Sequence, residues 1–163
     1  MDKEKNKVSM EDVVPLIEEC LQSGSSVTFF PKGISMLPML RQGKDSVTLS
    51  PVSGKLKKYD LPLYRRENGK YVLHRVVKVK NDEYIMAGDH QFEYESGISH
   101  RQIVAVVTEF QRDGRDHSVN EIGYQLYCRL WHYSRFPRRC LRALKYRVRR
   151  LLKKEDKHGK KTN

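Results

Sequence analysis

Long apolar runs and paired cysteines are both missing from this 163-residue chain. No apolar stretch approaches the roughly 20 residues that a membrane-spanning helix needs. Residues 1–7 alternate in charge and lead into no apolar segment, so they lack the pattern of a secretory signal. The sequence therefore predicts a protein that is cytoplasmic or bound peripherally to a membrane.

The cysteines and histidines give no sign of a metal site or a disulfide framework. Cys20, Cys128 and Cys140 are far apart in the chain, which argues against disulfide pairing and against structural zinc. The histidines show no ligand spacing with cysteines or acidic residues, and no phosphate-binding glycine loop is present. We expect neither a metal nor a cofactor.

Acidic residues are scarce at the C-terminal end. Residues 129–163 contain 14 Lys and Arg but 2 Asp and Glu, whereas residues 1–128 contain 18 of each kind, so the net charge of +12 belongs to the end of the chain. The sequence predicts a basic amphipathic helical region over residues 121–152, interrupted at Pro137, and a disordered tail over residues 153–163. Its apolar stripe comprises Leu126, Leu130, Leu141, Leu144, Val148, Leu151 and Leu152.

This basic region allows three interpretations. A solvated helix face is the simplest one. An anionic membrane surface ranks above nucleic acid, because Trp131, Tyr133 and Phe136 accompany the basic residues and an apolar stripe runs beside the charge. Nucleic-acid binding depends on charge alone, and we do not expect it.

The first 120 residues divide into a helical segment and a β domain. Residues 1–26 contain apolar positions at helical spacing from 12 to 21, which predict a short amphipathic helix that packs on the body or on a partner. Residues 27–120 alternate β-type runs with turns, and Asn68-Gly69 and Asn81-Asp82 predict hairpins. The expected fold class is mainly β, a coiled and mostly antiparallel sheet. The runs cover residues 27–30, 46–49, 61–65, 71–80, 83–86 and 102–112.

A serine follows the first β-type run, within Gly33-Ile34-Ser35-Met36-Leu37-Pro38. Gly33 allows a sharp turn, and Pro38 keeps Leu37 out of the helical conformation. Such a turn would direct the Ser35 hydroxyl and amide toward one point, as acyl transfer requires. We take Ser35 as a candidate nucleophile, with an ordinary turn serine as the alternative.

The order of the segments around and after Ser35 resembles the signal peptidase I and LexA-like serine peptidases. In that superfamily a Ser-Met-x-Pro box supplies the nucleophile, a strand with Lys-Arg-Val-Val or His-Arg-Val-Val supplies the base, and Gly-Asp follows. The resemblance covers about residues 27–110 and implies a LexA-like or signal peptidase-like β fold. Histidine at the base position is typical of the endoplasmic-reticulum-type enzymes. The segments are Ser35-Met36-Leu37-Pro38, residues 43–47, residues 59–65, His74-Arg75-Val76-Val77 and Ala87-Gly88-Asp89.

The resemblance implies a serine endopeptidase that cleaves a peptide or precursor protein, such as a signal peptide precursor, through an acyl-enzyme. Ser35 is the expected nucleophile and His74 the expected general base, since imidazole titrates in the physiological range. Asp89 is the expected orienter of the imidazole, with a turn aspartate as the alternative. Asp45 and Asp60 are expected to have structural roles in turns.

The oxyanion site and the substrate groove are expected beside the nucleophile. The Ser35 amide is one donor, and Gly33 stands where several bacterial enzymes add a serine hydroxyl, so the second donor is left open. Met36, Leu37 and Pro38 are expected to line a groove for an extended peptide, or else to belong to the core.

Two other functions are compatible with these patterns. A LexA-type self-cleaving repressor needs a DNA-binding domain and a cleavage site before the serine, and neither is present before residue 27, so we discount it. A non-catalytic module would keep the β fold and use the basic helix to hold a membrane or nucleic acid.

Overall fold

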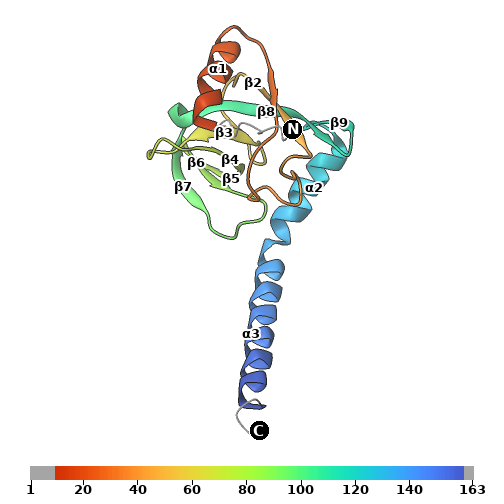
Figure 1. The fold of residues 1–163 in the computed structure, drawn as a ribbon. Helices are drawn as coiled ribbons and strands as arrows, with labels where there is room; N and C mark the ends of the chain where they lie inside the picture. The colour runs from red at the N-terminus through yellow and green to blue at the C-terminus, as the bar shows by residue number, and fades with distance from the viewer. Residues whose placement is uncertain (1–9, 160–163) are drawn as a thin grey trace.

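Two antiparallel sheets form the body of the protein (Figure 1). The computed structural model describes residues 10–159. The larger sheet follows the order β1 (Val27–Phe29), β2 (Ser46–Ser50), β8 (Ile103–Arg112), β3 (Pro62–Arg65) and β4 (Tyr71–Leu73), with β9 (Arg115–Ser118) also paired to β8. The smaller sheet comprises β5 (Arg75–Lys80), β6 (Glu83–Ala87) and β7 (Glu95–Ser99). This architecture confirms the mainly β, antiparallel fold class.

Both predicted hairpins form. Arg65 pairs with Tyr71 across the Asn68-Gly69 turn, where Gly69 has a φ of 81°. Lys80 pairs with Glu83 across the second turn. The sequence missed two strands, β7 and β9, because each is short and mostly polar and so shows no apolar alternation. A short 3-10 turn, η1 (His100–Gln102), leads from β7 into β8.

The predicted strand over residues 71–80 is wrong at its centre, because the chain leaves one sheet and enters the other at His74. β4 ends at Leu73, which pairs with Leu63 of the larger sheet. β5 begins at Arg75, which pairs with Ala87 of the smaller sheet. His74 therefore lies at the junction of the two sheets.

The main core lies between the larger sheet, the first helix and the turn after β1. α1 (Met10–Gln22) begins two residues before the predicted start, and it buries Val14, Ile17 and Leu21. Gly24, with a φ of 78°, ends the helix. α1 therefore packs on the body of the protein, which was one of the two expected alternatives. The buried set also includes Met36, Met39, Leu40, Val47, Leu49, Leu61, Leu63, Ala105 and Val107.

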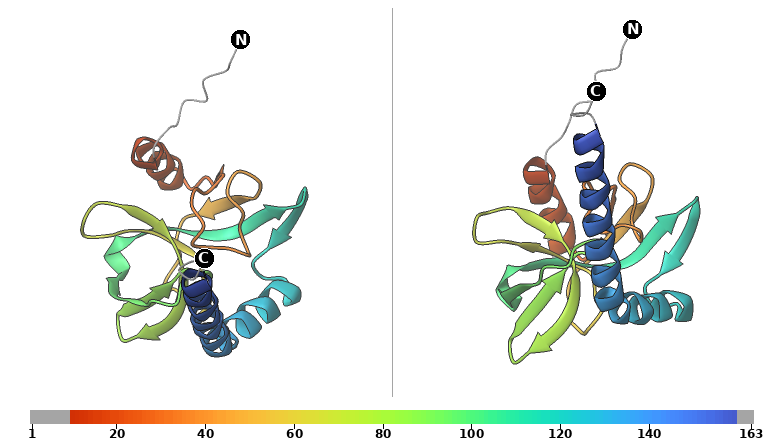
Figure 2. Two further views of the ribbon diagram at one scale, coloured as in Figure 1. Left: turned by 60° about the horizontal axis from the view of Figure 1, so that its bottom comes forward. Right: turned by 90° about the horizontal axis from the view of Figure 1, so that it is seen from below.

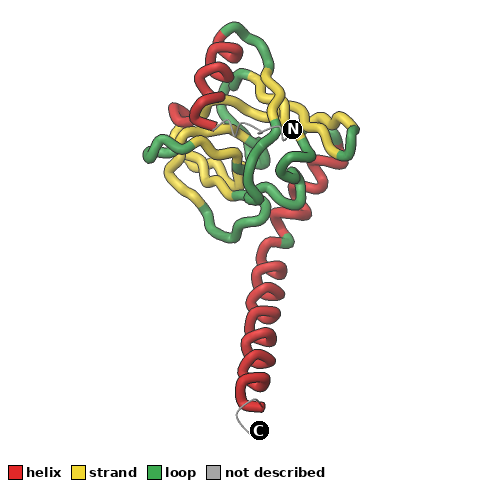
Figure 3. The backbone as a smooth tube through the Cα atoms, viewed as in Figure 1, coloured by secondary structure: helices red, strands yellow, loops and turns green. Residues whose placement is uncertain are grey.

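The C-terminal region forms two helices, α2 (Ile122–Tyr133) and α3 (Arg135–Gly159). The expected interruption occurs at Ser134, three residues before Pro137, and Figure 3 shows it as a short loop. Pro137 lies in the first turn of α3, where proline removes no intrahelical hydrogen bond. Residues 153–159, expected to belong to a disordered tail, continue α3, while residues 160–163 lie outside the described part.

α2 packs beside the sheets, whereas α3 extends away from the body (Figures 1 and 2). The exposed apolar side chains of α3 include Phe136, Leu141 and Leu144. Within residues 10–159, no helix has both the length and the apolar character needed to cross a bilayer.

Candidate active site

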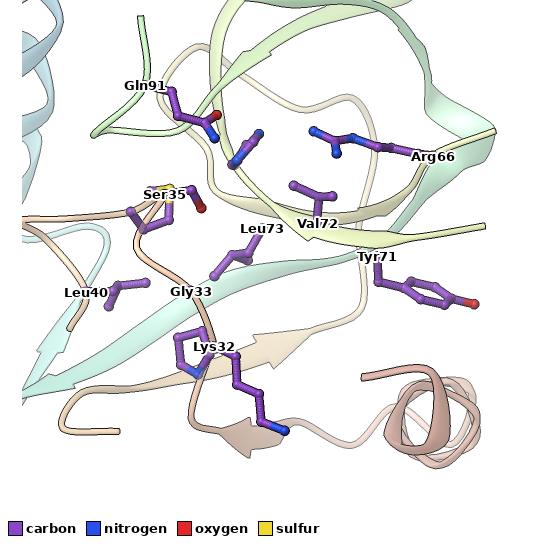
Figure 4. A pocket seen from close by; sticks show the side chains of 12 residues that line it. Lys32, Gly33, Ser35, Leu40, Arg66, Tyr71, Val72, Leu73 and Gln91 are labelled. Carbon is purple, nitrogen blue, oxygen red and sulfur yellow. The ribbon is translucent and has the colours of Figure 1, made fainter. Parts of the chain in front are cut away.

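Ser35 and His74 line the same cavity, which has a volume of about 260 Å³. Ser35 comes from the turn after β1 and His74 from the junction between β4 and β5. Figure 4 shows Ser35 and Gln91 on one side of this cavity, with Arg66 and Val72 across from them. The structure thus brings together the predicted nucleophile and the predicted base.

The turn that carries Ser35 is anchored in the core and by a polar contact of its backbone. Met36 and Leu40 are buried directly after it, and both reach the cavity wall. Gly33, with a φ of 96°, donates its N–H to Gln42 Oε1 at 2.8 Å. Leu37 and Pro38, expected in the groove with Met36, do not line this cavity. Ser35 is half-buried and lines the cavity.

His74 is 3% exposed, and its ring Nδ1 lies 3.3 Å from the hydroxyl oxygen of Tyr64. Burial, followed by the charge of Arg66, lowers the pKa of His74 to about 4. The imidazole is therefore neutral near pH 7, as a general base must be.

No hydrogen bond between Ser35 Oγ and the His74 ring is found in the described part of the chain. Catalytic hydrogen bonds often tighten only when substrate is bound.

Asp89 does not orient His74, contrary to the expectation from the sequence. Its carboxylate accepts two hydrogen bonds from Arg75, at 2.8 and 2.7 Å, and a longer one from Tyr127 at 3.3 Å. Asp89 and Arg75 are both almost fully buried. A buried pair with this geometry strongly favours one arrangement of its segments, because either charge alone would be costly to bury. Asp89 therefore fixes its own loop to β5.

This loop in turn holds the backbone of the candidate nucleophile. The N–H of His90 donates to the Ser35 carbonyl oxygen at 2.9 Å. A Cβ added to Gly88 would lie 2.6 Å from the same oxygen and 3.1 Å from Ser35 Cβ. Only glycine at position 88 allows this close approach.

α2 and the start of α3 support the same loop, a role that was not predicted from the sequence. Trp131 Nε1 donates to the Asp89 carbonyl oxygen at 2.9 Å, and Arg135 donates to the carbonyl oxygens of Gly88 and Gln91. Arg75 also donates to the hydroxyl of Tyr124 on α2 at 2.8 Å. A sequence signal existed, since Tyr124, Tyr127, Cys128 and Trp131 recur at spacings of one helical turn.

A second polar cluster lies behind His74. The hydroxyl of Tyr64, a buried residue of β3, donates to Glu95 Oε2 at 2.8 Å. Arg66 donates to both Glu95 oxygens, at 2.8 and 2.6 Å. These three residues come from β3, the following turn and β7, so no local sequence pattern connects them.

Two groups beside the candidate nucleophile have N–H groups that could serve an oxyanion, the Ser35 backbone and the Gln91 side chain. No acceptor is found for the Ser35 N–H in the part of the chain that the structure describes. The side-chain amide of Gln91 lies at the cavity beside Ser35 (Figure 4).

Neither a metal centre nor a relative assigns a role to this site. Across residues 10–159 there is no group of three or more His, Cys, Asp or Glu side chains able to hold a metal ion. Comparison of the chain with protein-family models, with curated proteins and with solved structures found no match. The functional argument therefore depends on geometry and chemistry.

Proposed function

We propose that the protein is a serine endopeptidase with the fold of the signal peptidase and LexA-like superfamily. It would cleave a peptide or precursor protein in the cytoplasm or at a membrane surface. The observation that carries the proposal is the cavity shared by Ser35 and a buried, neutral His74. A serine hydroxyl becomes a useful nucleophile when such a base accepts its proton during attack.

In the acylation step, Ser35 Oγ attacks the carbonyl carbon of the substrate while its proton passes to His74. The oxyanion accepts hydrogen bonds from the Ser35 N–H and from the Gln91 side-chain amide, which we assign as the second donor. Collapse of the tetrahedral intermediate breaks the C–N bond, and His74 gives its proton to the leaving amine. Water then attacks the Ser35 ester, loses a proton to His74 and releases the acid, and the proton returns to Ser35 Oγ.

The sheet edge beside the cavity favours an extended peptide as the substrate. β4 ends the order of the larger sheet, and its residues Tyr71, Val72 and Leu73 line the cavity. An edge strand has unpaired N–H and C=O groups that an extended segment can join as a further strand. A peptide bound in this way would pass between Ser35 and His74.

Labelling with a fluorophosphonate probe tests the assignment directly, because the probe reacts with an activated serine. We expect the intact protein to gain one label, and Ser35→Ala to prevent it. His74→Ala should slow labelling by about 10²- to 10⁴-fold, the usual contribution of a general base. Ser96→Ala, at an exposed serine of β7, is the control and should label normally. Wild-type labelling in both Ser35→Ala and His74→Ala would contradict the proposal.

α3 supports a second candidate function, attachment to an anionic membrane. Leu141 and Leu144 are 65% and 58% exposed, and Arg138, Arg142 and Lys145 lie between and beside them in the sequence. An apolar stripe beside dense positive charge matches a helix that lies in the interface of an anionic bilayer. This function is compatible with peptidase activity or could stand alone.

A further inference from the structure

The geometry assigns Tyr64 and Glu95 as positioning residues that fix the tautomer of His74. The importance of this tautomer for catalysis rests on the proposed function, in which His74 is the base. The role expected of Asp89 is thus filled by a different carboxylate, which acts on the imidazole through a tyrosine hydroxyl.

The first step is the charge of Glu95. Arg66 donates two hydrogen bonds to its carboxylate, at 2.8 and 2.6 Å, in a side-by-side arrangement. Partial burial acts in the opposite direction, but the hydrogen bonds from Arg66 and Tyr64 hold the pKa of Glu95 below its ordinary value. Glu95 is therefore ionised near neutral pH and can only accept hydrogen bonds.

The second step is the direction of the tyrosine hydroxyl. Burial, followed by the hydrogen bond to Glu95, raises the pKa of Tyr64 above its usual range, so the hydroxyl keeps its proton. A phenol has one proton to donate, and the ionised Glu95 receives it at 2.8 Å. The oxygen of Tyr64 then faces His74 Nδ1, 3.3 Å away, as an acceptor.

The third step concerns the two ring nitrogens. A neutral imidazole carries one N–H, and the hydrogen bond made by one nitrogen decides which nitrogen is protonated. With the acceptor Tyr64 Oη beside Nδ1, the proton resides on Nδ1. Nε2 is left with its lone pair on the side of the ring away from Tyr64, available to a group in the cavity that contains Ser35.

The contacts of Asp89 support this division of roles. Both of its oxygens are engaged by Arg75 and Tyr127, and none of its hydrogen bonds reaches His74. Asp89 therefore holds the loop that contacts Ser35, whereas Glu95 holds the histidine through Tyr64. Two carboxylates, one buried and one half-buried, position the two reacting side chains separately.

Long-range ¹H–¹⁵N NMR of the full chain with ¹⁵N-labelled histidine measures this tautomer without any need for activity. The His74 signals are assigned by their loss in His74→Gln. We expect the wild type to show the Nδ1–H form of His74. Tyr64→Phe should convert a large part of the population to the Nε2–H form, and Glu95→Gln should do so to a smaller extent, because a glutamine amide can donate to Tyr64 and free its proton.

The chain contains a matched control. Tyr84 is also buried, and its hydroxyl lies 3.0 Å from Nδ1 of His100; within residues 10–159 no carboxylate is hydrogen-bonded to it. Tyr84→Phe removes the same group from the same core cluster, and it should leave the signals of His74 unchanged. Circular dichroism shows whether each variant is folded. If Tyr64→Phe does not fold, the tautomer of His74 in Glu95→Gln, a change at a half-buried residue, tests the inference.

Kinetics then separate this inference from the proposed function. With a cleavable peptide, Tyr64→Phe should lower kcat by about 10- to 100-fold, part of what a general base contributes, with KM nearly unchanged. An inactive wild type with the expected tautomer shifts would refute the peptidase and retain the positioning role. A His74 that stays in the Nδ1–H form in both variants, or that is Nε2–H in the wild type, would overturn the inference.

Discussion

The N–H of His90 donates a hydrogen bond of 2.9 Å to the carbonyl oxygen of Ser35. This contact joins the loop after β6 to the turn after β1, and it places the candidate nucleophile under the control of a loop that Arg75, Trp131 and Arg135 also hold. The position of the serine is therefore set from both sheets and both C-terminal helices.

Gly88→Ala should reduce activity strongly, because the added Cβ would lie 2.6 Å from the Ser35 carbonyl oxygen and one of the two backbones must move. A displacement of this kind can cost about 10²-fold in rate. The measurement is the rate of fluorophosphonate labelling at Ser35, together with the melting temperature. Gly123→Ala is the matched control, since a Cβ there meets no atom within 4 Å. Equal labelling rates in the two variants would contradict the prediction.

Asp89→Asn should destabilise the fold, because it leaves the Arg75 guanidinium buried without its ionised partner. Breaking a buried pair in this way costs about 3–5 kcal/mol in the free energy of unfolding. Urea denaturation followed by circular dichroism measures the loss. Asp82→Asn breaks the exposed pair with Lys55, and its unfolding curve should superimpose on that of the wild type. A stable Asp89→Asn would show that the buried pair is dispensable.

Gln91→Leu should impair acylation while leaving substrate binding largely intact. Removal of one oxyanion donor usually costs about 10²- to 10³-fold in kcat. The leucine side chain has a similar size but cannot donate a hydrogen bond, so the loss would be in kcat. A change confined to KM would assign Gln91 to substrate binding instead.

The pH profile should reflect the lowered pKa of His74. The value of kcat/KM should keep its plateau below pH 6.5, the ordinary pKa of histidine, and should fall by half near pH 4, where the buried imidazole gains its proton. A half-maximal point near pH 6.5 would contradict burial of the neutral ring. The charged groups that act on this ring are Arg66, Glu95, Asp89 and Arg135.

The same shift predicts the pH dependence of stability. As the pH falls from 6.5 toward 4, His74 gains a proton in the unfolded chain but not in the folded one. The unfolded state then binds more protons, so the free energy of unfolding decreases over this interval. His74→Gln should make the decrease shallower in urea titrations across the same pH values, and an unchanged slope would count against the shift.

Leu144→Gln should weaken binding to vesicles of phosphatidylcholine mixed with phosphatidylserine. Glutamine has a helix propensity close to that of leucine, while the lost apolar burial of about 1.5–3 kcal/mol corresponds to at least a tenfold lower affinity. Leu16→Gln, at an equally exposed leucine of α1, should bind as the wild type does. Binding should also fall with salt and be weak to phosphatidylcholine alone. Equal binding to both vesicle types would argue against an anionic surface.

Local patterns in the sequence predicted most of the sheet. The turn residues Asn68-Gly69 and Asn81-Asp82 determine backbone conformation within a few residues, so they located both hairpins. The break at His74 could not be predicted in this way, because Tyr71 to Lys80 has continuous strand character and the change of sheet depends on partners far along the chain. The strands β7 and β9 each pair with one strand only and are mostly polar. They therefore lack the apolar alternation by which a strand is recognised in a sequence.

The order of the sequence segments predicted that Ser35 and His74 would lie together, but it did not predict the residues that hydrogen-bond to His74 and Asp89. Ser35 and His74 reached one cavity, as expected, but the carboxylate assigned to His74 pairs with the neighbouring Arg75. Whether Asp89 contacts His74 or the adjacent Arg75 depends on how its loop packs against β5. The spacing of residues in the sequence does not determine this. Tyr64 and Glu95 were not predicted, because a tyrosine and a glutamate in separate strands give no sequence pattern that links them to each other or to His74.

His74 occupies a position that pairs with no residue of either sheet, between Leu73 of one ladder and Arg75 of the other. A lysine in place of His74, at this junction of the two sheets, would change the proton acceptor without altering the register of any strand. The proposed base therefore lies outside the backbone pairing that holds each of the two sheets together.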